Sequence, residues 1–278
     1  MPQVRLSQGT VHYQDTGGSG PTVVCVHGLL VNGGLWSGLR LDPGTRVVIP
    51  DLPLGSHSEA MRPEADLSPA GLARLVADFL AALELTDVTL IGNDTGGAIC
   101  QLVAADRPER VGSLVLTNCD AYDNFLPPAF RPLQLLPRIP GGMALLARTL
   151  RLAPVRAAFG VLSQAPIPTE MFDSWVGPIR RDGGVRADAT KVLRGITRKE
   201  TQRAIAVLRD FDKPVLLAWG TGDGFFRPAY ARRLAGDIPG ARLEWIEHAR
   251  TFVPLDAPEK LSRIVADFVS TQTQRSQP

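Results

Sequence analysis

The sequence predicts an α/β protein with a doubly wound, mostly parallel eight-stranded sheet and a helical lid insertion. Short apolar runs alternate with stretches of helical periodicity along most of the chain. This alternation is typical of a parallel sheet covered by helices on both faces. It breaks between residues 120 and 212, where proline and helical fragments replace strands. A length of 278 residues is sufficient for one such domain with a single insertion.

Eight runs are expected to form the strands. Residues 3–7 and 10–15 flank Gly9 and are expected to pair as a hairpin. The others are continuous apolar runs, as expected of strands buried on both faces. They cover residues 22–26, 46–49, 88–91, 113–116, 215–219 and 242–246.

Helices are expected between these strands. Ser68 is an N-cap residue followed by Pro69 at the first helical position, and apolar residues recur at helical spacing up to Leu83. Other helices are expected over residues 96–105, 228–235 and 258–268, and helical pieces of the insertion over 143–152, 169–176 and 201–208. Residues 1–119 and 213–278 are therefore predicted to form the core. Residues 120–212 are predicted to form a cap or lid, because long insertions are usually functional.

Composition restricts the partners and the compartment. The net charge is +2 without a basic run, which offers no case for nucleic acid or an anionic membrane. No signal-peptide pattern and no apolar run of about 20 residues is present. The three cysteines, Cys25, Cys100 and Cys119, lie in apolar runs without metal-ligand spacing and are expected to be buried free thiols. We therefore expect a cytoplasmic monomer or homodimer that binds a small apolar organic substrate, without a metal or an organic cofactor.

The most informative motif is the strand–turn–helix sequence over residues 88–98. A buried strand runs into Gly92-x-Asp94-x-Gly96, and a helix begins there. Glycine on both sides permits a turn so tight that the central residue is strained. Free backbone amides and the helix dipole at this helix start favour an anion. Asp94 is thus a candidate reactive carboxylate; the alternative is an aspartate that only caps the helix.

This turn resembles the nucleophile elbow of the α/β-hydrolase superfamily, with aspartate in place of serine. The strand that ends at His27-Gly28 resembles the superfamily's oxyanion loop. The resemblance implies that the backbone amides of Leu29 and Thr95 form an oxyanion hole and that His27 is structural. It also implies that Asp223, which follows the strand over residues 214–219, is the acid of the catalytic triad.

Within the superfamily, a chain with an aspartate nucleophile resembles haloalkane dehalogenases, fluoroacetate dehalogenases and epoxide hydrolases. The resemblance implies hydrolysis of a small or medium apolar substrate, such as an epoxide, a haloalkane or an ester-like compound. Asp94 would form an ester that a histidine base helps to hydrolyse. The usual histidine position is Thr251 here, and His248 lies three residues earlier. Either the loop rearranges so that His248 reaches the site as the base, or the site has no histidine.

Markers of the individual subclasses are absent. Haloalkane dehalogenases carry a halide-binding tryptophan after the nucleophile, where Thr95 stands, so another donor such as Asn32, Trp36 or Trp175 would be needed. Epoxide hydrolases use lid tyrosines, and only Tyr122 lies at the edge of the lid.

The run over residues 118–125 follows a strand, where open α/β sheets bind ligands, and it supplies Asp120 and Tyr122 as candidates. Asp120 is also an alternative position for the acid. Asn93 either orients the nucleophile or satisfies local backbone groups. These residues and Thr251 complete the candidate substrate-binding set. The alternatives to hydrolysis are a non-hydrolytic, cofactor-free lyase, isomerase or cyclase, and a binding protein that has lost catalysis.

Overall fold

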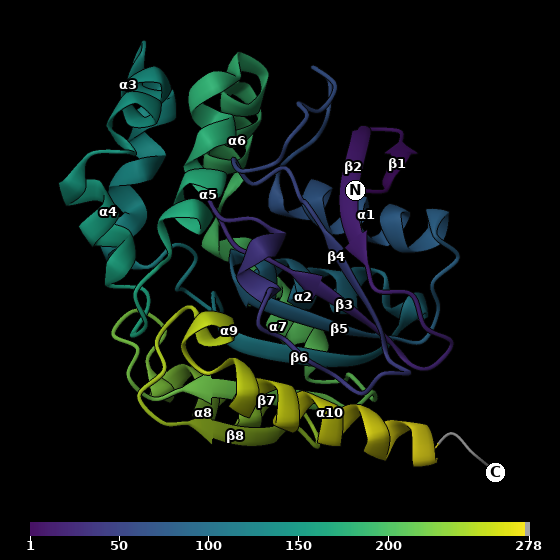
Figure 1. Ribbon diagram of the computed structural model, residues 1–278. Helices are drawn as coiled ribbons and strands as arrows, with labels where there is room; N and C mark the ends of the chain where they lie inside the picture. The colour runs from purple at the N-terminus through teal and green to yellow at the C-terminus, as the bar shows by residue number, and fades with distance from the viewer. Residues whose placement is uncertain (276–278) are drawn as a thin grey trace.

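Eight strands form a single sheet in the computed structural model, which describes residues 1–275 (Figure 1). Their order across the sheet is β1-β2-β4-β3-β5-β6-β7-β8. β1 and β2 pair antiparallel with each other and β2 with β4, and the remaining pairs are parallel. The predicted doubly wound, mostly parallel eight-stranded sheet is confirmed. The strands are β1 (Gln3–Leu6), β2 (Gly9–Asp15), β3 (Thr22–Val26), β4 (Arg46–Pro50), β5 (Val88–Asp94), β6 (Val111–Cys119), β7 (Val215–Gly220) and β8 (Arg242–Ile246).

Helices lie on both faces of this sheet, with α10 in front of it and α2 and α7 behind it in Figure 1. Ser68 caps α1 as expected, because its side chain accepts a hydrogen bond from the backbone N–H of Gly71 at 3.2 Å. No helix of residues 1–275 is long and apolar enough to cross a lipid bilayer. The helical elements outside residues 128–195 are η1 (Gly33–Trp36), α1 (Pro69–Ala82), α2 (Thr95–Asp106), η2 (Pro108–Arg110), α7 (Arg198–Leu208), α8 (Pro228–Asp237), α9 (Val253–Asp256) and α10 (Pro258–Arg275).

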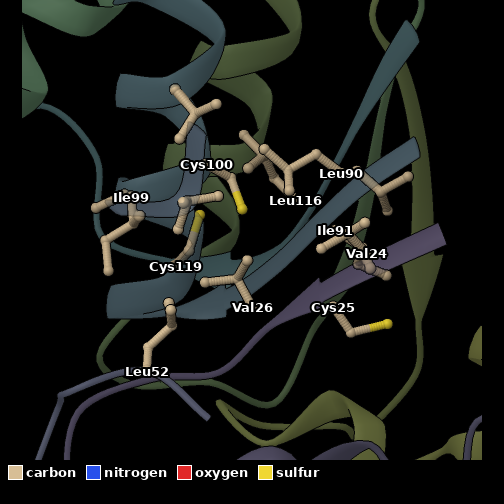
Figure 2. Close-up of a cluster of buried hydrophobic side chains, with 14 of the residues drawn as sticks. Val24, Cys25, Val26, Leu52, Leu90, Ile91, Ile99, Cys100, Leu116 and Cys119 are labelled. Carbon is tan, nitrogen blue, oxygen red and sulfur yellow. The ribbon is translucent and has the colours of Figure 1, made fainter. Parts of the chain in front are cut away.

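Part of the hydrophobic core lies between the sheet and α2. Figure 2 shows Cys25, Cys100 and Cys119 among the aliphatic side chains of β3, β5, β6 and α2. All three thiols are buried and free, as the sequence predicts. Burial raises the pKa of the Cys119 thiol, and the negative charge of Asp120 raises it further. These cysteines therefore pack as small apolar residues beneath the sheet's C-terminal edge.

The insertion contains five helical segments: η3 (Pro128–Arg138), α3 (Gly142–Thr149), α4 (Ala153–Gly160), α5 (Thr169–Arg181) and α6 (Gly183–Gly195). The helix expected over residues 143–152 instead breaks after Thr149, and α4 begins just before Pro154. α6 has no counterpart in the sequence prediction. It starts with two glycines, and the side chain of Asp182 caps it by accepting from the backbone N–H groups of Gly184 and Val185.

The predicted lid over residues 120–212 also contains α7. That helix packs against α2 rather than against the other inserted helices. Figure 1 places α3 and α4 at the outer edge of the molecule, beyond α5 and α6. The division into core and lid remains a prediction, but the inserted helices farthest from the sheet are α3 and α4.

Candidate active site

Asp94 stands on a strained turn between β5 and α2. Its φ of 55° and ψ of −131° are costly for a residue with a side chain. A Cβ atom at Gly92 would lie 2.6 Å from the carbonyl oxygen of Gly96, and one at Gly96 would meet the carbonyl oxygens of Val26 and His27. Both positions therefore need glycine, for the reason that the sequence pattern suggests. The turn holds the Asp94 side chain at the C-terminal edge of the sheet.

The Asp94 carboxyl lies against the two backbone amides that the resemblance implies. The N–H of Leu29 donates to Oδ2 of Asp94 at 3.2 Å. The N–H of Thr95 also hydrogen-bonds to this carboxyl. The structure thus brings together Asp94, Leu29 and Thr95, three residues that the sequence places in one site.

Burial determines the protonation of Asp94. It raises the pKa of this carboxyl to about 7, because the charged form loses hydration. The amides of Thr95 and Leu29 oppose the rise by stabilising the anion, and the nearby charge of Asp223 adds to it. The side chain is only half-buried, and the part that remains accessible lines a cavity. Asp94 can therefore exchange a proton near neutral pH.

Asp223 is held by four hydrogen bonds. Its Oδ1 accepts from the backbone N–H groups of Phe225 at 2.7 Å and Phe226 at 3.1 Å. Its Oδ2 accepts from Nδ2 of Asn118 at 2.8 Å and from Oγ1 of Thr251 at 2.9 Å. The carboxylate predicted to be the triad acid is thus fixed in place, and one of its two side-chain partners is the hydroxyl of Thr251, the position predicted to correspond to the histidine base.

His248 does not join this group. It has a left-handed backbone, with φ of 61°, and its side chain is exposed. Its backbone N–H donates to Oγ1 of Thr221 at 3.1 Å, whereas Thr251 is buried and contacts Asp223. The loop therefore turns position 251 inward and position 248 outward. The structure gives no support to His248 as the base.

The other histidines have structural partners elsewhere in residues 1–275. Nε2 of His27 accepts from the backbone N–H of Leu52 at 2.9 Å, and burial lowers its pKa to about 4. His57 is buried and lies 3.1 Å from Oδ2 of Asp188 on α6. His12 contacts Glu59 at the surface. None of these contacts reaches Asp94 or Asp223.

Three candidate donors to a substrate lie outside the cavity wall. Asn32 caps η1 through its side-chain oxygen, and its Nδ2 donates to Ser174 of α5 at 3.3 Å. The indoles of Trp36 and Trp175 are fully buried, and that of Trp175 packs edge-on against Phe252, with ring centroids 5.5 Å apart. None of the three lines the cavity above Asp94.

Tyr122 and Asn93 also point elsewhere. The hydroxyl of Tyr122 donates to Asp237 at 2.9 Å. Nδ2 of Asn93 donates to the carbonyl oxygen of Thr251 at 2.7 Å and to Oγ1 of Thr117 at 2.9 Å. Of the two alternatives for Asn93, the structure favours the satisfaction of local groups over substrate contact.

Asp120 lies beside Asp94 but beneath the cavity. It is fully buried, and its Oδ2 accepts from Oγ1 of Thr95 at 3.2 Å. Burial raises the pKa of this carboxyl, and the charge of Asp94 raises it further. Asp120 is therefore linked to the site through the hydroxyl of Thr95.

A cavity of about 380 Å³ opens above Asp94, within the usual size range of small-molecule sites. Asp94 is the sole ionisable side chain that lines it among the described residues. The remaining lining is apolar and comes mainly from η3, α3 and α4. It includes Leu126, Phe130, Leu146, Leu150, Phe159 and Phe226.

Two kinds of residue in this site are not predicted from the sequence. Asn118, which holds Asp223, comes at the C-terminal end of β6, and this is the signal that selects its neighbour Asp120. Phe226 and most of the other lining residues give no such signal, because apolar residues in a helical insertion look the same whether they pack or line a cavity.

Comparison with known proteins identifies the family. The family profile described as "alpha/beta hydrolase fold" matches residues 21–258. The chain therefore belongs to the α/β-hydrolase fold family. An uncharacterized protein of Mycobacterium tuberculosis is 29% identical to it over 264 residues, which cover 91% of this chain and 76% of that protein.

Several similar proteins are named haloalkane dehalogenases. That of Mycolicibacterium paratuberculosis is 29% identical over 278 residues, which cover 92% of this chain and 86% of that protein. The solved structure of haloalkane dehalogenase DbeA from Bradyrhizobium elkani has a TM-score of 0.82, with 98% of each chain covered and 21% identity. At that identity the structural similarity establishes the fold alone.

Proposed function

We propose that this protein hydrolyses a small to medium apolar substrate, such as an epoxide, a haloalkane or an ester-like compound, with Asp94 as its reactive group. The observation that carries the proposal is the position of Asp94. Its carboxyl is the sole ionisable group lining the 380 Å³ cavity within residues 1–275. An uncharged substrate can be buried there without leaving a second charge unpaired.

In this proposal Asp94 acts as a nucleophile. One carboxylate oxygen attacks an electrophilic carbon of the substrate, and the bond from that carbon to the halide or to the epoxide oxygen breaks with its electron pair. The other oxygen stays at the amides of Leu29 and Thr95 as the carbonyl oxygen of the new ester. Water then attacks the carbonyl carbon, and the same amides stabilise the negative charge that develops on this oxygen. The bond from the carbonyl carbon to the oxygen that carries the substrate breaks, that oxygen takes a proton from the attacking water and leaves as the alcohol, and Asp94 returns as the carboxylate.

A second candidate is proton transfer by Asp94 in a non-hydrolytic reaction of a lyase, isomerase or cyclase. Two observations favour it. The hydroxyl of Thr251 contacts Asp223, where a histidine base would be expected from the family resemblance, and a threonine hydroxyl is not a base near neutral pH. The pKa of Asp94 is about 7, close to the optimum for a group that both accepts and returns a proton. This route needs no water and no ester.

Intact-mass spectrometry after incubation with epoxide and haloalkane panels separates these functions. Turnover together with an Asp94 adduct that forms and clears supports nucleophilic hydrolysis. An adduct that persists supports attack by Asp94 on the substrate. It also indicates that the ester is not hydrolysed because the site lacks a histidine base. The absence of both an adduct and turnover would contradict hydrolysis. The remaining functions would then be proton transfer and binding without catalysis.

A single turnover in H₂¹⁸O adds an independent readout. In the nucleophilic route the product of the first turnover carries unlabelled oxygen from Asp94, and the label appears in the carboxyl of Asp94. Label found directly in the product would contradict nucleophilic attack and indicate that Asp94 activates water as a base.

A further inference from the structure

One part of the insertion has an unusual surface. Residues 126–168, here called the outer cap segment, contain η3, α3 and α4. Five of the seven exposed large hydrophobic side chains of the described residues belong to this segment, and each is 47–60% exposed: Leu135, Ile139, Leu145, Leu152 and Val161. A helix at an aqueous surface normally presents polar residues outward. The concentration of exposed apolar side chains in one segment makes this segment a candidate contact surface.

The charge of the outer cap segment is one-sided. It contains five arginines and no lysine, aspartate or glutamate: Arg131, Arg138, Arg148, Arg151 and Arg156. The segment carries +5 and the whole chain +2, so the remainder carries −3. No ion pair of the described residues involves any of these arginines. The near-neutral overall composition, from which no membrane partner is expected, thus conceals a strongly basic segment.

The helices of this segment also form the wall of the cavity. Leu146 of α3 lines the cavity, while the neighbouring Leu145 is exposed on the outside. In α4 and its flanks, Phe159 lines the cavity, while Leu152 and Val161 are exposed. A single layer of helix therefore separates the apolar cavity from the apolar outer surface. Figure 1 places α3 and α4 at the outer edge of the molecule, where a flat partner can reach them.

We propose that the outer cap segment docks on the surface of an anionic phospholipid bilayer. Helices that combine exposed aliphatic residues with basic residues lie in the lipid interface, with aliphatic groups inserted and cations at the phosphates. Arg148 and Arg151, which form no ion pair within the described part of the chain, match lipid phosphates, and Leu145 and Leu152 reach the acyl boundary. A second copy of this chain is a poorer partner, because a symmetric contact would bring the two sets of arginines together. Docking would place the cavity beside a reservoir of apolar compounds.

Vesicle flotation tests this proposal without any substrate. The protein is mixed with vesicles of phosphatidylcholine alone or of phosphatidylcholine with phosphatidylglycerol. Binding is expected only to the anionic vesicles, and high salt should weaken it by screening. Arg148→Gln together with Arg151→Gln should lower the partition coefficient by roughly fivefold for each charge removed. Leu145→Ser together with Leu152→Ser should lower binding at all salt concentrations.

Matched controls lie outside the segment. Arg263→Gln removes one exposed charge from α10, and Val207→Ser alters an exposed aliphatic residue of α7. Both variants should bind vesicles like the unmodified protein. Asp94→Asn should also bind normally, so failure of the hydrolytic function and failure of the membrane inference are separable.

Three results would overturn the membrane inference. One is equal binding to neutral and anionic vesicles, and another is absence of binding at low salt. The third is a dimer that dissociates in the Leu145→Ser/Leu152→Ser variant, measured by light scattering, which would assign the surface to a second copy.

Discussion

Oγ1 of Thr251 donates a hydrogen bond to Oδ2 of Asp223 over 2.9 Å. Thr251, which is predicted from the sequence to stand at the position of the histidine base, is therefore in contact with the residue predicted to be the triad acid. A hydroxyl there can orient Asp223 but cannot take a proton from water near neutral pH. In the proposed site, attack of Asp94 on the substrate can therefore be rapid, whereas hydrolysis of the resulting ester lacks a general base and should be slow.

Replacement of Thr251 by histidine is expected to supply the missing base. In the nucleophilic route, hydrolysis of the ester on Asp94 should accelerate by about 10²–10⁴-fold, the usual contribution of a positioned general base. The measurement is the rate at which the Asp94 adduct disappears. Thr251→Val is the control, because it removes the hydroxyl without supplying a base. Equal adduct lifetimes in the Thr251→His and Thr251→Val variants would count against this assignment.

Asp94→Asn should abolish activity, with a loss of about three orders of magnitude or more. Its stability should respond to pH differently from that of the unmodified protein. The folded state raises the pKa of Asp94 from 3.8 to about 7, so it binds this proton more tightly than the unfolded state does. The stability from this group is complete below pH 3.8 and declines as the pH rises through about 7. Urea denaturation at several pH values should show a smaller decline in the variant; an unchanged decline would refute the pKa assignment.

The pH dependence of the rate should report the same carboxyl. Asp94 must be ionised to attack carbon or to accept a proton. Because its pKa is about 7, kcat/KM should fall tenfold per pH unit well below 7 and level off above it. The charge of Asp223 contributes to that raised pKa, so Asp223→Asn should move the acid limb to lower pH. Circular dichroism of this variant verifies its fold, and an acid limb that stays in place would exclude this coupling.

Asn118→Ala should destabilise the protein by about 1–3 kcal/mol, because it leaves a buried carboxylate oxygen short of a donor. The amide of Asn118 donates to Asp223 at 2.8 Å and its oxygen accepts from the backbone N–H of Gly220. Asn124→Ala is the matched control, since that side chain donates only to the carbonyl of Phe225, at 3.2 Å. The free energies of unfolding from urea titration decide the comparison. Similar losses in both variants would remove the special role given to Asn118.

The sheet and the turn at Asp94 could be predicted because local physics specifies them. Buried strands such as Thr22–Val26 are continuous apolar runs, and the glycines beside Asp94 fill sites where a Cβ atom would collide. The position of Asp223 was also predictable, since it follows a recognisable strand. These features depend on residues close together in the sequence.

The remainder of the site depends on long-range packing. The loop that follows β8 folds back toward the end of β7, and this path decides whether His248 or Thr251 faces Asp223. Just after β7, Oγ1 of Thr221 accepts a hydrogen bond from the backbone N–H of His248. α6 was not anticipated because its first residues, Gly183 and Gly184, oppose helix formation, and the cap from Asp182 compensates. The cavity itself is a space between distant segments and has no local pattern.

The cavity described above draws its floor and its walls from different stretches of chain. Asp94 belongs to the sheet, whereas Leu146, Leu150 and Phe159 belong to an inserted stretch that no strand depends on. If Asp94 acts as proposed, reactivity and selectivity are encoded by separate stretches of chain. Evolution or design could then exchange the helices that line the cavity, while the carboxyl keeps its strand, its turn and its amides.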